Sequence, residues 1–563
     1  MRSRMQSGKR KRSLKRLGII AAILLVLGLG ALFVLAHFYV EPVLRKRLHT
    51  LIIEGSDSLY TYRLGALKAN VFGGNIEIKD LQIVVDSNRY AVLKRQQALP
   101  AMVVQLDVKN ASINGIGIFS LLFNRKIIID EISSKQADIR VFRNFQKKDT
   151  STAVTENKLP LWKTLQSQIN DIRVDKIKLD GIKLLYRNSE EIDAAKLQFD
   201  RCDALFENIR VDSTSAVDTS RLGYVENFSF KLNDLKFRTP DSTYKLKAEW
   251  ITYNSATRLL QIDSFKLQPT LKKEEREDSL RKSWYTVTFD RVDFLGLRLD
   301  RYLRLNRAEA DSVVFENPNL DIYQDKKGLK SYKSKIGQYP HQQLLNAGAI
   351  IDIKKFIARN MQIDVTEKHE ETRQEGTIQL RSLNITVQNI VNDPVLIRRN
   401  PVATASAAGT IIGSPIQADF RFYLDSAEGR FDVKGSLQNV TAKQINPLSL
   451  TLANIEVPSA NIQNLNFFVR GEDYGAVADV QMRYDNLSIV FLKRDEETGD
   501  LTTRSFLTKL LNNFAIYNSN PVSGTERKAE NVKTARLTTQ AFFGVIWQAV
   551  FAGIQNIILK TGA

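Results

Sequence analysis

The chain has 563 residues, of which 43% are hydrophobic and 25% are charged, a composition that excludes a largely disordered protein. Its single cysteine, Cys202, excludes intramolecular disulfides and zinc sites built from paired cysteines. The net charge of +19 comes without any sequence signature of nucleic-acid binding, so we expect no nucleic-acid partner.

The first forty residues have the features of a membrane anchor. Residues 1–16 hold eight Lys or Arg and no acidic residue, and residues 17–40 carry no full charge. As a helix this apolar run would extend about 36 Å, which exceeds the hydrocarbon layer of about 30 Å. A cleavable signal peptide would have a shorter apolar core. Because basic residues concentrate before the run, we expect the N-terminus in the cytoplasm and the chain from Glu41 onward across the membrane.

From Leu64 onward, apolar and polar residues alternate, which is typical of strands with one apolar face. The alternation changes phase at Asp80. The links are short Asx or Gly turns, which favour antiparallel hairpins, and no long helical pattern is present to connect parallel strands. We therefore predict a mainly β fold, an elongated, twisted antiparallel sheet of repeated strands. The clearest alternating segments are residues 75–79, 177–180, 244–250 and 430–435. Residues 480–490 predict a further pair of strands, with a break near residues 484–486.

One stretch of the chain recurs. Ile116–Phe142 aligns without a gap with Leu297–Tyr323, 181 positions later, and the same offset aligns Val104 with Tyr285. A slip of two residues is needed to align Ile177 with Phe356. Few residues are identical, so coincidental β periodicity is one explanation. The polar links between strands also coincide, which favours an internal duplication and a stacked architecture.

Helical patterns are few. Residues 161–169, 342–347 and 506–512 each predict a short helix, and residues 272–282 form a charged surface segment. The clearest helix lies within Thr538–Lys560. We predict that it packs on the end of the sheet or lies at a membrane surface, because Gln548, Gln555 and Asn556 disfavour insertion. Its candidate membrane-contacting or partner-contacting residues are Phe542, Phe543, Ile546, Trp547, Val550 and Ile554.

Sequence signatures of catalysis are absent. The chain contains no H-E-x-x-H, G-x-S-x-G or P-loop sequence, and its four histidines are scattered. Acidic clusters such as Glu274-Glu275 are typical of solvated loops. We therefore predict no catalytic residue, no cofactor and no metal ligand, although catalytic carboxylates would leave no local signature.

The order of parts resembles the AsmA-like family of bacterial envelope proteins, whose relatives include TamB and YhdP. This resemblance implies a long β-sheet curled into an apolar groove, with a single-pass anchor in the bacterial inner membrane and the body in the periplasm. It also implies phospholipid as the bound partner and a role in outer-membrane lipid homeostasis. The stretches that carry the resemblance are Leu17–Val40, Ile116–Phe142, Gly429–Gly435, Tyr484–Leu487 and Phe542–Trp547.

Strand alternation selects the groove candidates, because every second residue of a strand faces the same side. Two alternatives remain open. The apolar faces of two sheets could instead pack together as a dry sandwich core, and the protein could be a non-catalytic envelope scaffold or assembly factor that binds outer-membrane proteins at a sheet edge or at its C-terminal end. The candidate groove-lining residues are Ile139, Val141, Leu320, Ile322, Phe431 and Val433.

These patterns predict seven successive segments. They are a basic cytoplasmic tail (1–16), a transmembrane anchor (17–40), a first β segment (41–103), a first β repeat with an extension (104–284), a second β repeat (285–400), a C-terminal β segment (401–500) and a C-terminal helical region (501–563).

Overall fold

The structure of the protein is a computed structural model. The predicted anchor at residues 17–40 and the predicted helices at residues 161–169 and 506–512 lie outside the residues it describes. Among the described residues, no helix combines the length and apolar character needed to cross a membrane. The described residues are 42–46, 48–50, 52–70, 73–100, 102–117, 120, 124–143, 171–187, 195–215, 218, 221–239, 241–272, 275, 283–326, 333–368, 373–453, 455–494, 501–503 and 516–560.

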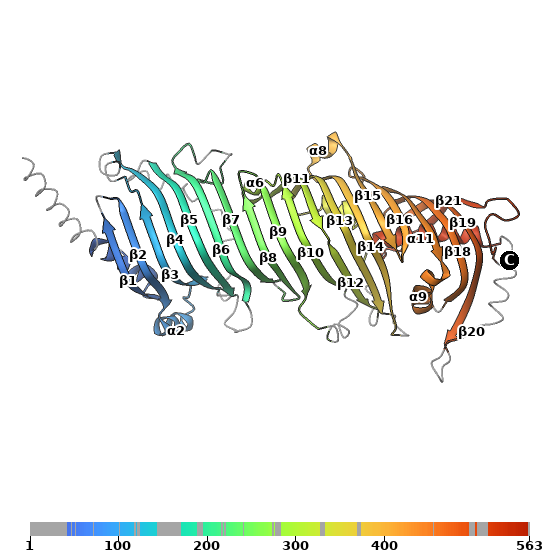
Figure 1. The fold of residues 1–563 in the computed structure, drawn as a ribbon, viewed down its shortest axis with the longest axis horizontal. Coiled ribbons are helices and arrows are strands. Elements are labelled where there is room, and N and C mark those ends of the chain that lie inside the picture. The colour runs from blue at the N-terminus through green and yellow to red at the C-terminus, as the bar shows by residue number, and fades with distance from the viewer. Residues whose placement is uncertain are drawn as a thin grey trace, which may run out of the picture. The chain divides into compact units, whose positions relative to one another are not determined.

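The protein is mainly β, as predicted, and divides into two compact units, Met1–Leu235 and Lys236–Ala563 (Figure 1). Strand β7 (Asn227–Arg238) runs across the division. Unit 1 contains β1 (Tyr60–Asn70), β2 (Asn75–Val85), β3 (Met102–Asn114), β4 (Lys126–Arg143), β5 (Asp171–Arg187) and β6 (Ala195–Val211), with the short helices η1 (Glu54–Ser56) and α2 (Ser87–Arg95).

Unit 2 continues from β8 to the C-terminal helix. Its strands are β8 (Tyr244–Asn254), β9 (Leu259–Pro269), β10 (Ser283–Leu295), β11 (Arg307–Glu316), β12 (Asn319–Asp325), β13 (Ile350–Lys368), β14 (Glu375–Val391), β15 (Val402–Ile411), β16 (Ser414–Tyr423), β17 (Phe431–Thr441), β18 (Ile455–Glu472), β19 (Gly475–Arg494), β20 (Leu501–Thr503) and β21 (Lys528–Ala535). Its helices are α6 (Leu299–Leu305), α7 (Pro340–Leu345), α8 (Pro394–Arg399), α9 (Ala442–Ala453) and α11 (Phe542–Ile558). The predicted helices at residues 342–347 and within Thr538–Lys560 are thus confirmed as α7 and α11.

Most strand pairs are antiparallel, but the prediction of an antiparallel sheet throughout was wrong at two places. β4 pairs with β5 in parallel, and β11 and β12 both pair with β13 in parallel. A parallel pair needs a connection of about a dozen residues or more. Residues 144–170 and 326–349 provide that length, and α7 in the second connection has only 6 residues. Because neither connection carries a long helical pattern, the crossovers left no signal in the sequence.

The strand pairing of unit 1 recurs in unit 2 with the predicted offset. Met102 of β3 is opposite Arg143 of β4, and Ser283 of β10 is opposite Gln324 of β12. Left-handed backbone positions also recur. The recurring pairs are Gly115 and Gly296, Arg125 and Asn306, Gln136 and Asn317, Gly181 and Asn360, and Asn208 and Asn389. The repetition therefore extends from the alternation of residues to strand register and backbone conformation.

One of these recurring positions requires glycine. Gly115 and Gly296 both have φ near +71°, and a Cβ at either position would collide with a neighbouring carboxylate, that of Asp130 or of Asp311. Only glycine adopts this conformation without steric cost and leaves space for the carboxylate. The repeat therefore preserves a tight turn as well as the strands.

Left-handed residues inside the strands explain the irregular alternation. Asp80 in β2 has φ of +50°, which confirms the predicted change of phase there. Asn486 in β19 has φ of +55°, and the strand continues through it. The prediction of two strands separated near residues 484–486 was therefore wrong, because this position is a local irregularity inside one strand. Short polar side chains tolerate this conformation, and such irregularities increase strand twist and bending.

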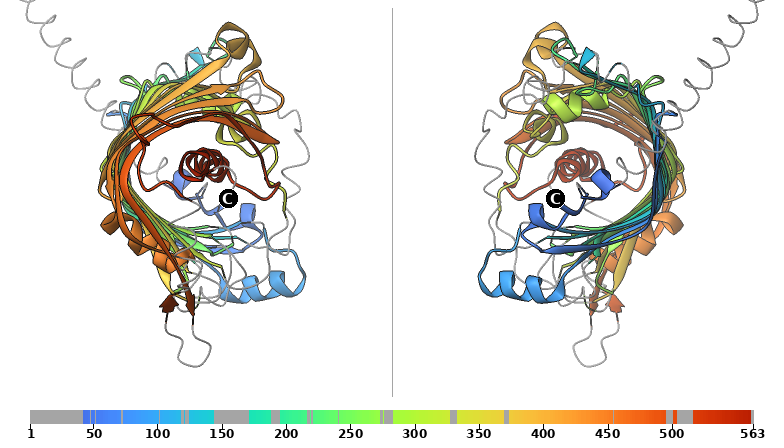
Figure 2. Two further views of the ribbon diagram at one scale, coloured as in Figure 1. Left: turned by 90° about the vertical axis from the view of Figure 1, so that its right-hand side faces the viewer. Right: turned by 90° about the vertical axis from the view of Figure 1, so that its left-hand side faces the viewer.

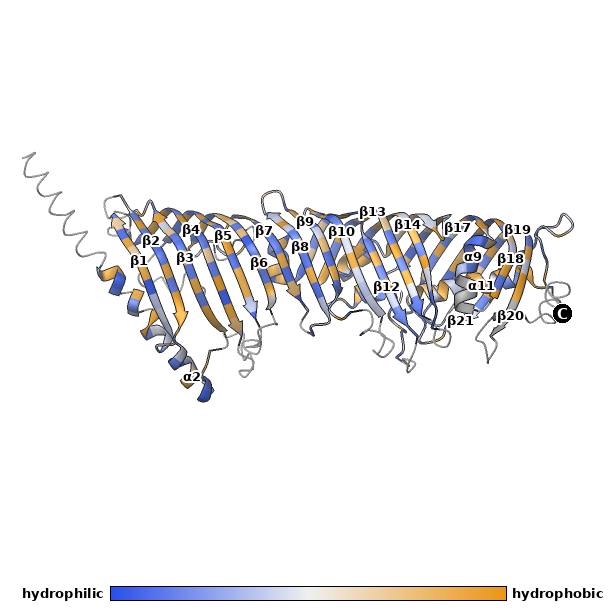
Figure 3. Cartoon of the chain, turned by 60° about the horizontal axis from the view of Figure 1, so that its bottom comes forward, coloured by the Kyte–Doolittle hydropathy of each residue, from blue (hydrophilic) through white to orange (hydrophobic). Residues whose placement is uncertain are grey.

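The largest apolar core of unit 2 lies between its C-terminal strands and α11. The helix packs on β18, β19 and β21, inside the arc that the strands of this unit make (Figure 2). Colouring by hydropathy shows apolar and polar bands alternating along the strands (Figure 3). One sheet face is therefore apolar, and α11 covers the C-terminal part of it.

Candidate functional site: an apolar sheet face and the helix that covers part of it

Strand register places the four predicted groove residues of unit 2 on one apolar face. Residues directly opposite each other on paired strands point to the same side of a sheet. One row of such neighbours is Val287, Leu320, Ile363, Leu380 and Ile411, from β10 to β15. A second row is Phe356, Val387, Ala405, Phe420, Val433, Val469 and Ala478, from β13 to β19.

The two rows lie on the same face because β15 runs without a register shift between Ala405 and Ile411. Both rows consist entirely of uncharged, mostly apolar side chains. The other face carries ionic groups. Arg291 Nε lies 3.3 Å from Asp293 Oδ1, and Asp321 of β12 is directly opposite Asp364 of β13 in the strand register. The sheet is thus amphipathic across many neighbouring strands.

Unit 1 has the same arrangement around its two predicted residues. Ile139 of β4 lies between Leu106 of β3 and Leu184 of β5. Val141 lies between Val104 and Tyr186 in the same way. On the other side of β4, exposed Arg140 reaches Asp138 at 3.3 Å. The alternation predicted for this strand therefore matches its pairing.

Burial divides the six candidates into two groups. Ile139, Val141, Leu320 and Ile322 are half-buried. Phe431 and Val433 are only 1% exposed and belong to the core under α11. The prediction that these two residues line an open groove was therefore wrong. They are on the expected face, but alternation along a strand does not reveal which element covers that face.

Helix α11 has two different apolar faces. Phe542, Ile546 and Val550 are buried in the core, and Ile554 packs at its edge. Three aromatic residues beside this buried face, which we call the aromatic stripe, stay exposed. Their exposed fractions are 70% for Phe543, 62% for Trp547 and 43% for Phe551. The six predicted residues of this helix therefore have two roles, anchoring the helix and presenting an apolar surface.

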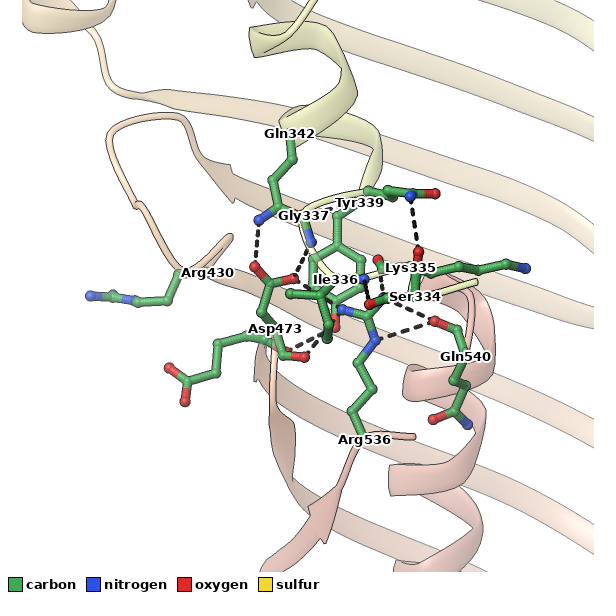
Figure 4. Close-up of polar contacts among 12 residues, drawn as sticks. Ser334, Lys335, Ile336, Gly337, Tyr339, Gln342, Arg430, Asp473, Arg536 and Gln540 are labelled. Carbon is green, nitrogen blue, oxygen red and sulfur yellow. Dashed lines mark hydrogen bonds and ion pairs between the residues drawn. The ribbon is translucent and has the colours of Figure 1, made fainter. Parts of the chain in front are cut away.

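A buried polar cluster, which we call the clasp, holds the start of α11 (Figure 4). It comprises Tyr339, Gln342, Asp473, Arg536 and Gln540. Arg536 Nη1 donates to Asp473 Oδ1 at 3.0 Å, and Arg536 Nη2 donates to the Gln540 carbonyl at 2.9 Å. The side chains of Arg536 and Asp473 are 0% and 6% exposed. The guanidinium carbon lies 4.2 Å from the centre of the Tyr339 ring.

The remaining contacts of the clasp connect three distant segments. Gln342 Nε2 donates to Asp473 Oδ2 at 2.7 Å, and the Tyr339 hydroxyl donates to the Glu472 carbonyl at 2.8 Å. Arg536 Nη2 also donates to the Lys335 carbonyl at 2.6 Å. The clasp thus joins the crossover before β13, the β18–β19 turn and the residues that precede α11. Burial raises the pKa of Tyr339 to about 12, so its hydroxyl stays protonated as a donor.

Sequence reasoning missed the clasp. Asp473 occupies a hairpin turn and Arg536 precedes an uncharged helix, and both positions are usually solvated. Their separation of 63 residues leaves no local spacing that would connect them. The only local signal was Pro340 with Gln342, which marks the start of α7.

His341 makes the stability of this region depend on pH. The imidazole is 3% exposed and lies between the Tyr339 and Phe422 rings. Burial lowers the pKa of His341 from 6.5 to about 4, against the opposing effects of the Gly429 backbone and of Asp473. A depressed histidine pKa stabilises the fold fully above pH 6.5, and that stability is lost as pH falls toward 4.

We expect unit 2 to lose about 3 kcal/mol of stability between pH 6.5 and pH 4 through His341, since one pKa unit corresponds to about 1.4 kcal/mol. Hydrogen exchange of peptides from α7 and β16, measured across this range, checks the loss. His341→Phe keeps an aromatic ring against Phe422 and should remove this part of the pH dependence. Equal pH dependence in both proteins would contradict the assignment.

No protein-family model matches the chain, and no curated protein matches it. Within the described residues, no group of three or more His, Cys, Asp or Glu is placed to hold a metal ion.

Proposed function

We propose that the protein binds the acyl chains of membrane phospholipids on its apolar sheet face and moves them between membranes of a bacterial envelope. In this proposal residues 17–40 anchor the chain in the inner membrane and the β units lie in the periplasm. The observation that carries the proposal is the uncharged row of half-exposed side chains that neighbours Leu320 and Ile322 from β10 to β15.

The chemistry required is desolvation. Moving a methylene group from water to an apolar surface contributes about 0.8 kcal/mol, so a long chain gains several kcal/mol even on a face that covers one side of it. A continuous row of uncharged side chains allows an acyl chain to slide along the sheet, because its binding free energy changes little from one position to the next. Such transport needs no catalytic residue.

The alternative is a scaffold that receives a partner strand at a sheet edge. Strand β21 pairs with β19, and no further strand pairs with it among the described residues. It has only 8 residues, carries Lys528 and Lys533, and is interrupted by Asn531 at φ of +54°. These features blunt a sheet edge against strand addition. They favour lipid binding over edge-mediated assembly at this end of the chain.

Photo-crosslinking in cells tests the proposal. A photoreactive phenylalanine analogue in place of Val141 or Ile322 should form phospholipid adducts, because these side chains lie on the apolar face. The same analogue in place of the adjacent Arg140 or Asp321, on the polar face, should form few. At Val433, under α11, it should form none. Lipid adducts at the polar positions in equal amount, or at neither apolar position, would contradict the proposal.

A further inference from the structure

The aromatic stripe of α11 is an exposed apolar surface that could contact a lipid. Phe543, Trp547 and Phe551 recur every four residues and so share one side of the helix. The Trp547 and Phe551 rings stack with their centres 5.8 Å apart. Three adjacent, exposed aromatic side chains are unusual on a soluble surface unless a partner covers them.

The position of the stripe favours a narrow, flexible ligand over a membrane surface or a folded domain. Helix α11 lies inside the arc of the unit 2 strands, and its buried face is turned toward them (Figure 2). The stripe lies beside this buried face and stays exposed, so it borders the space inside the arc. A flexible acyl chain can enter such a place, whereas a flat bilayer surface or a folded domain would meet the surrounding strands first.

Charge also argues against a helix that lies on a membrane. Such helices carry Lys and Arg on the face opposite their apolar face. From Leu537 to Leu559 this chain has no charged residue, and the face beside the stripe packs in a protein core. With a core on one face and uncharged aromatic rings on the next, α11 has nothing to attract anionic headgroups along its length.

Aromatic contacts connect the stripe to the apolar sheet face. The Phe543 ring lies 5.2 Å from the Phe542 ring, which lies 5.7 Å from Phe422 and 6.4 Å from Phe420, both on β16. Phe420 belongs to the second row of the apolar face. An apolar path therefore leads from the sheet, past the start of α11, to the stripe.

We infer that the aromatic stripe is a seat for a phospholipid acyl chain at the C-terminal end of the apolar face. This inference rests on the proposed function, because the same lipid reaches the seat along the sheet. It adds a second binding site for the lipid: the acyl chain leaves the half-buried strand residues and lies against Phe543, Trp547 and Phe551.

Photo-crosslinking of the full-length protein in cells tests the seat, with the photoreactive analogue at Phe551, at Ile322 or at Tyr474. Tyr474 is a matched control, because it is 67% exposed but lies in the β18–β19 turn. Phospholipid adducts at Phe551 and Ile322, with none at Tyr474, are expected. Adducts at Ile322 but not at Phe551 overturn the seat and leave the proposed function intact.

The other outcomes are equally decisive. A protein adduct at Phe551, whether to another protein or to a second segment of this chain, overturns the acyl-chain assignment because the stripe then has a protein occupant. No lipid at Phe551 or Ile322 overturns both the seat and the proposed function. Lipid at Phe551 alone supports the seat and contradicts lipid movement along the sheet.

A second variant separates contact with lipid from folding. Trp547→Ala removes an exposed side chain, so the hydrogen exchange of α11 should stay unchanged. The lipid adduct at Phe551 should fall about tenfold, which corresponds to about 1.4 kcal/mol and is less than the burial of one large side chain contributes. The adduct at Ile322 should be retained. An unchanged yield at Phe551 overturns the seat.

Discussion

Replacing Arg536 with methionine is expected to destabilise the C-terminal part of unit 2 by about 3–5 kcal/mol, the usual effect of removing one partner of a buried ion pair. The variant leaves the Asp473 carboxylate buried without its cation. It also removes the Arg536 donor from the Gln540 carbonyl, and it removes one of the two donors to the Lys335 carbonyl, which keeps the Gln338 N–H. Hydrogen exchange of β17 and α11 peptides in the full-length protein measures the loss, because it reports local opening.

The matched control is Lys354→Met. Lys354 pairs with Asp311 on the surface, and both side chains are largely exposed, so its removal should cost less than about 1 kcal/mol. The double variant Arg536→Met with Asp473→Leu removes both buried charges and should recover part of the loss. If Arg536→Met affects exchange no more than Lys354→Met does, the clasp does not hold α11.

Replacing Val433 with aspartate should unfold the core under α11, whereas Ile322→Asp should leave unit 2 folded. Val433 is 1% exposed against α11 and its neighbouring strands. An unpaired carboxylate there costs several kcal/mol or forces the region open. Ile322 is half-buried, so a carboxylate there keeps part of its hydration, and the expected cost is about 1–2 kcal/mol of lost apolar burial.

Protection of strand amides against exchange, together with lipid crosslinking at neighbouring positions on β13, distinguishes the two variants. Ile322→Asp should reduce lipid capture at neighbouring positions on β13 and keep the strands protected. If Ile322→Asp opens unit 2 as severely as Val433→Asp does, the whole apolar face is a packed core. The sandwich alternative would then replace the groove.

The amino-acid sequence by itself determined the strands, their apolar face and the repetition. Alternation along a strand depends only on the next few residues, so the face of Ile139 and Leu320 could be predicted without any partner. The same holds for the change of phase at Asp80, where a short polar side chain tolerates the left-handed backbone. The uncharged run within Thr538–Lys560 likewise determined α11.

Only the tertiary structure decided which strands pair in parallel, what covers each part of the apolar face, and which charges meet. β4 joins β5 in parallel across residues 144–170, and alternation is the same for either strand direction. Phe431 and Ile322 have similar strand patterns, yet α11 covers only Phe431. Asp473 and Arg536 pair across 63 residues. Such contacts depend on which distant segments of the chain come together, and no local pattern of residues specifies that.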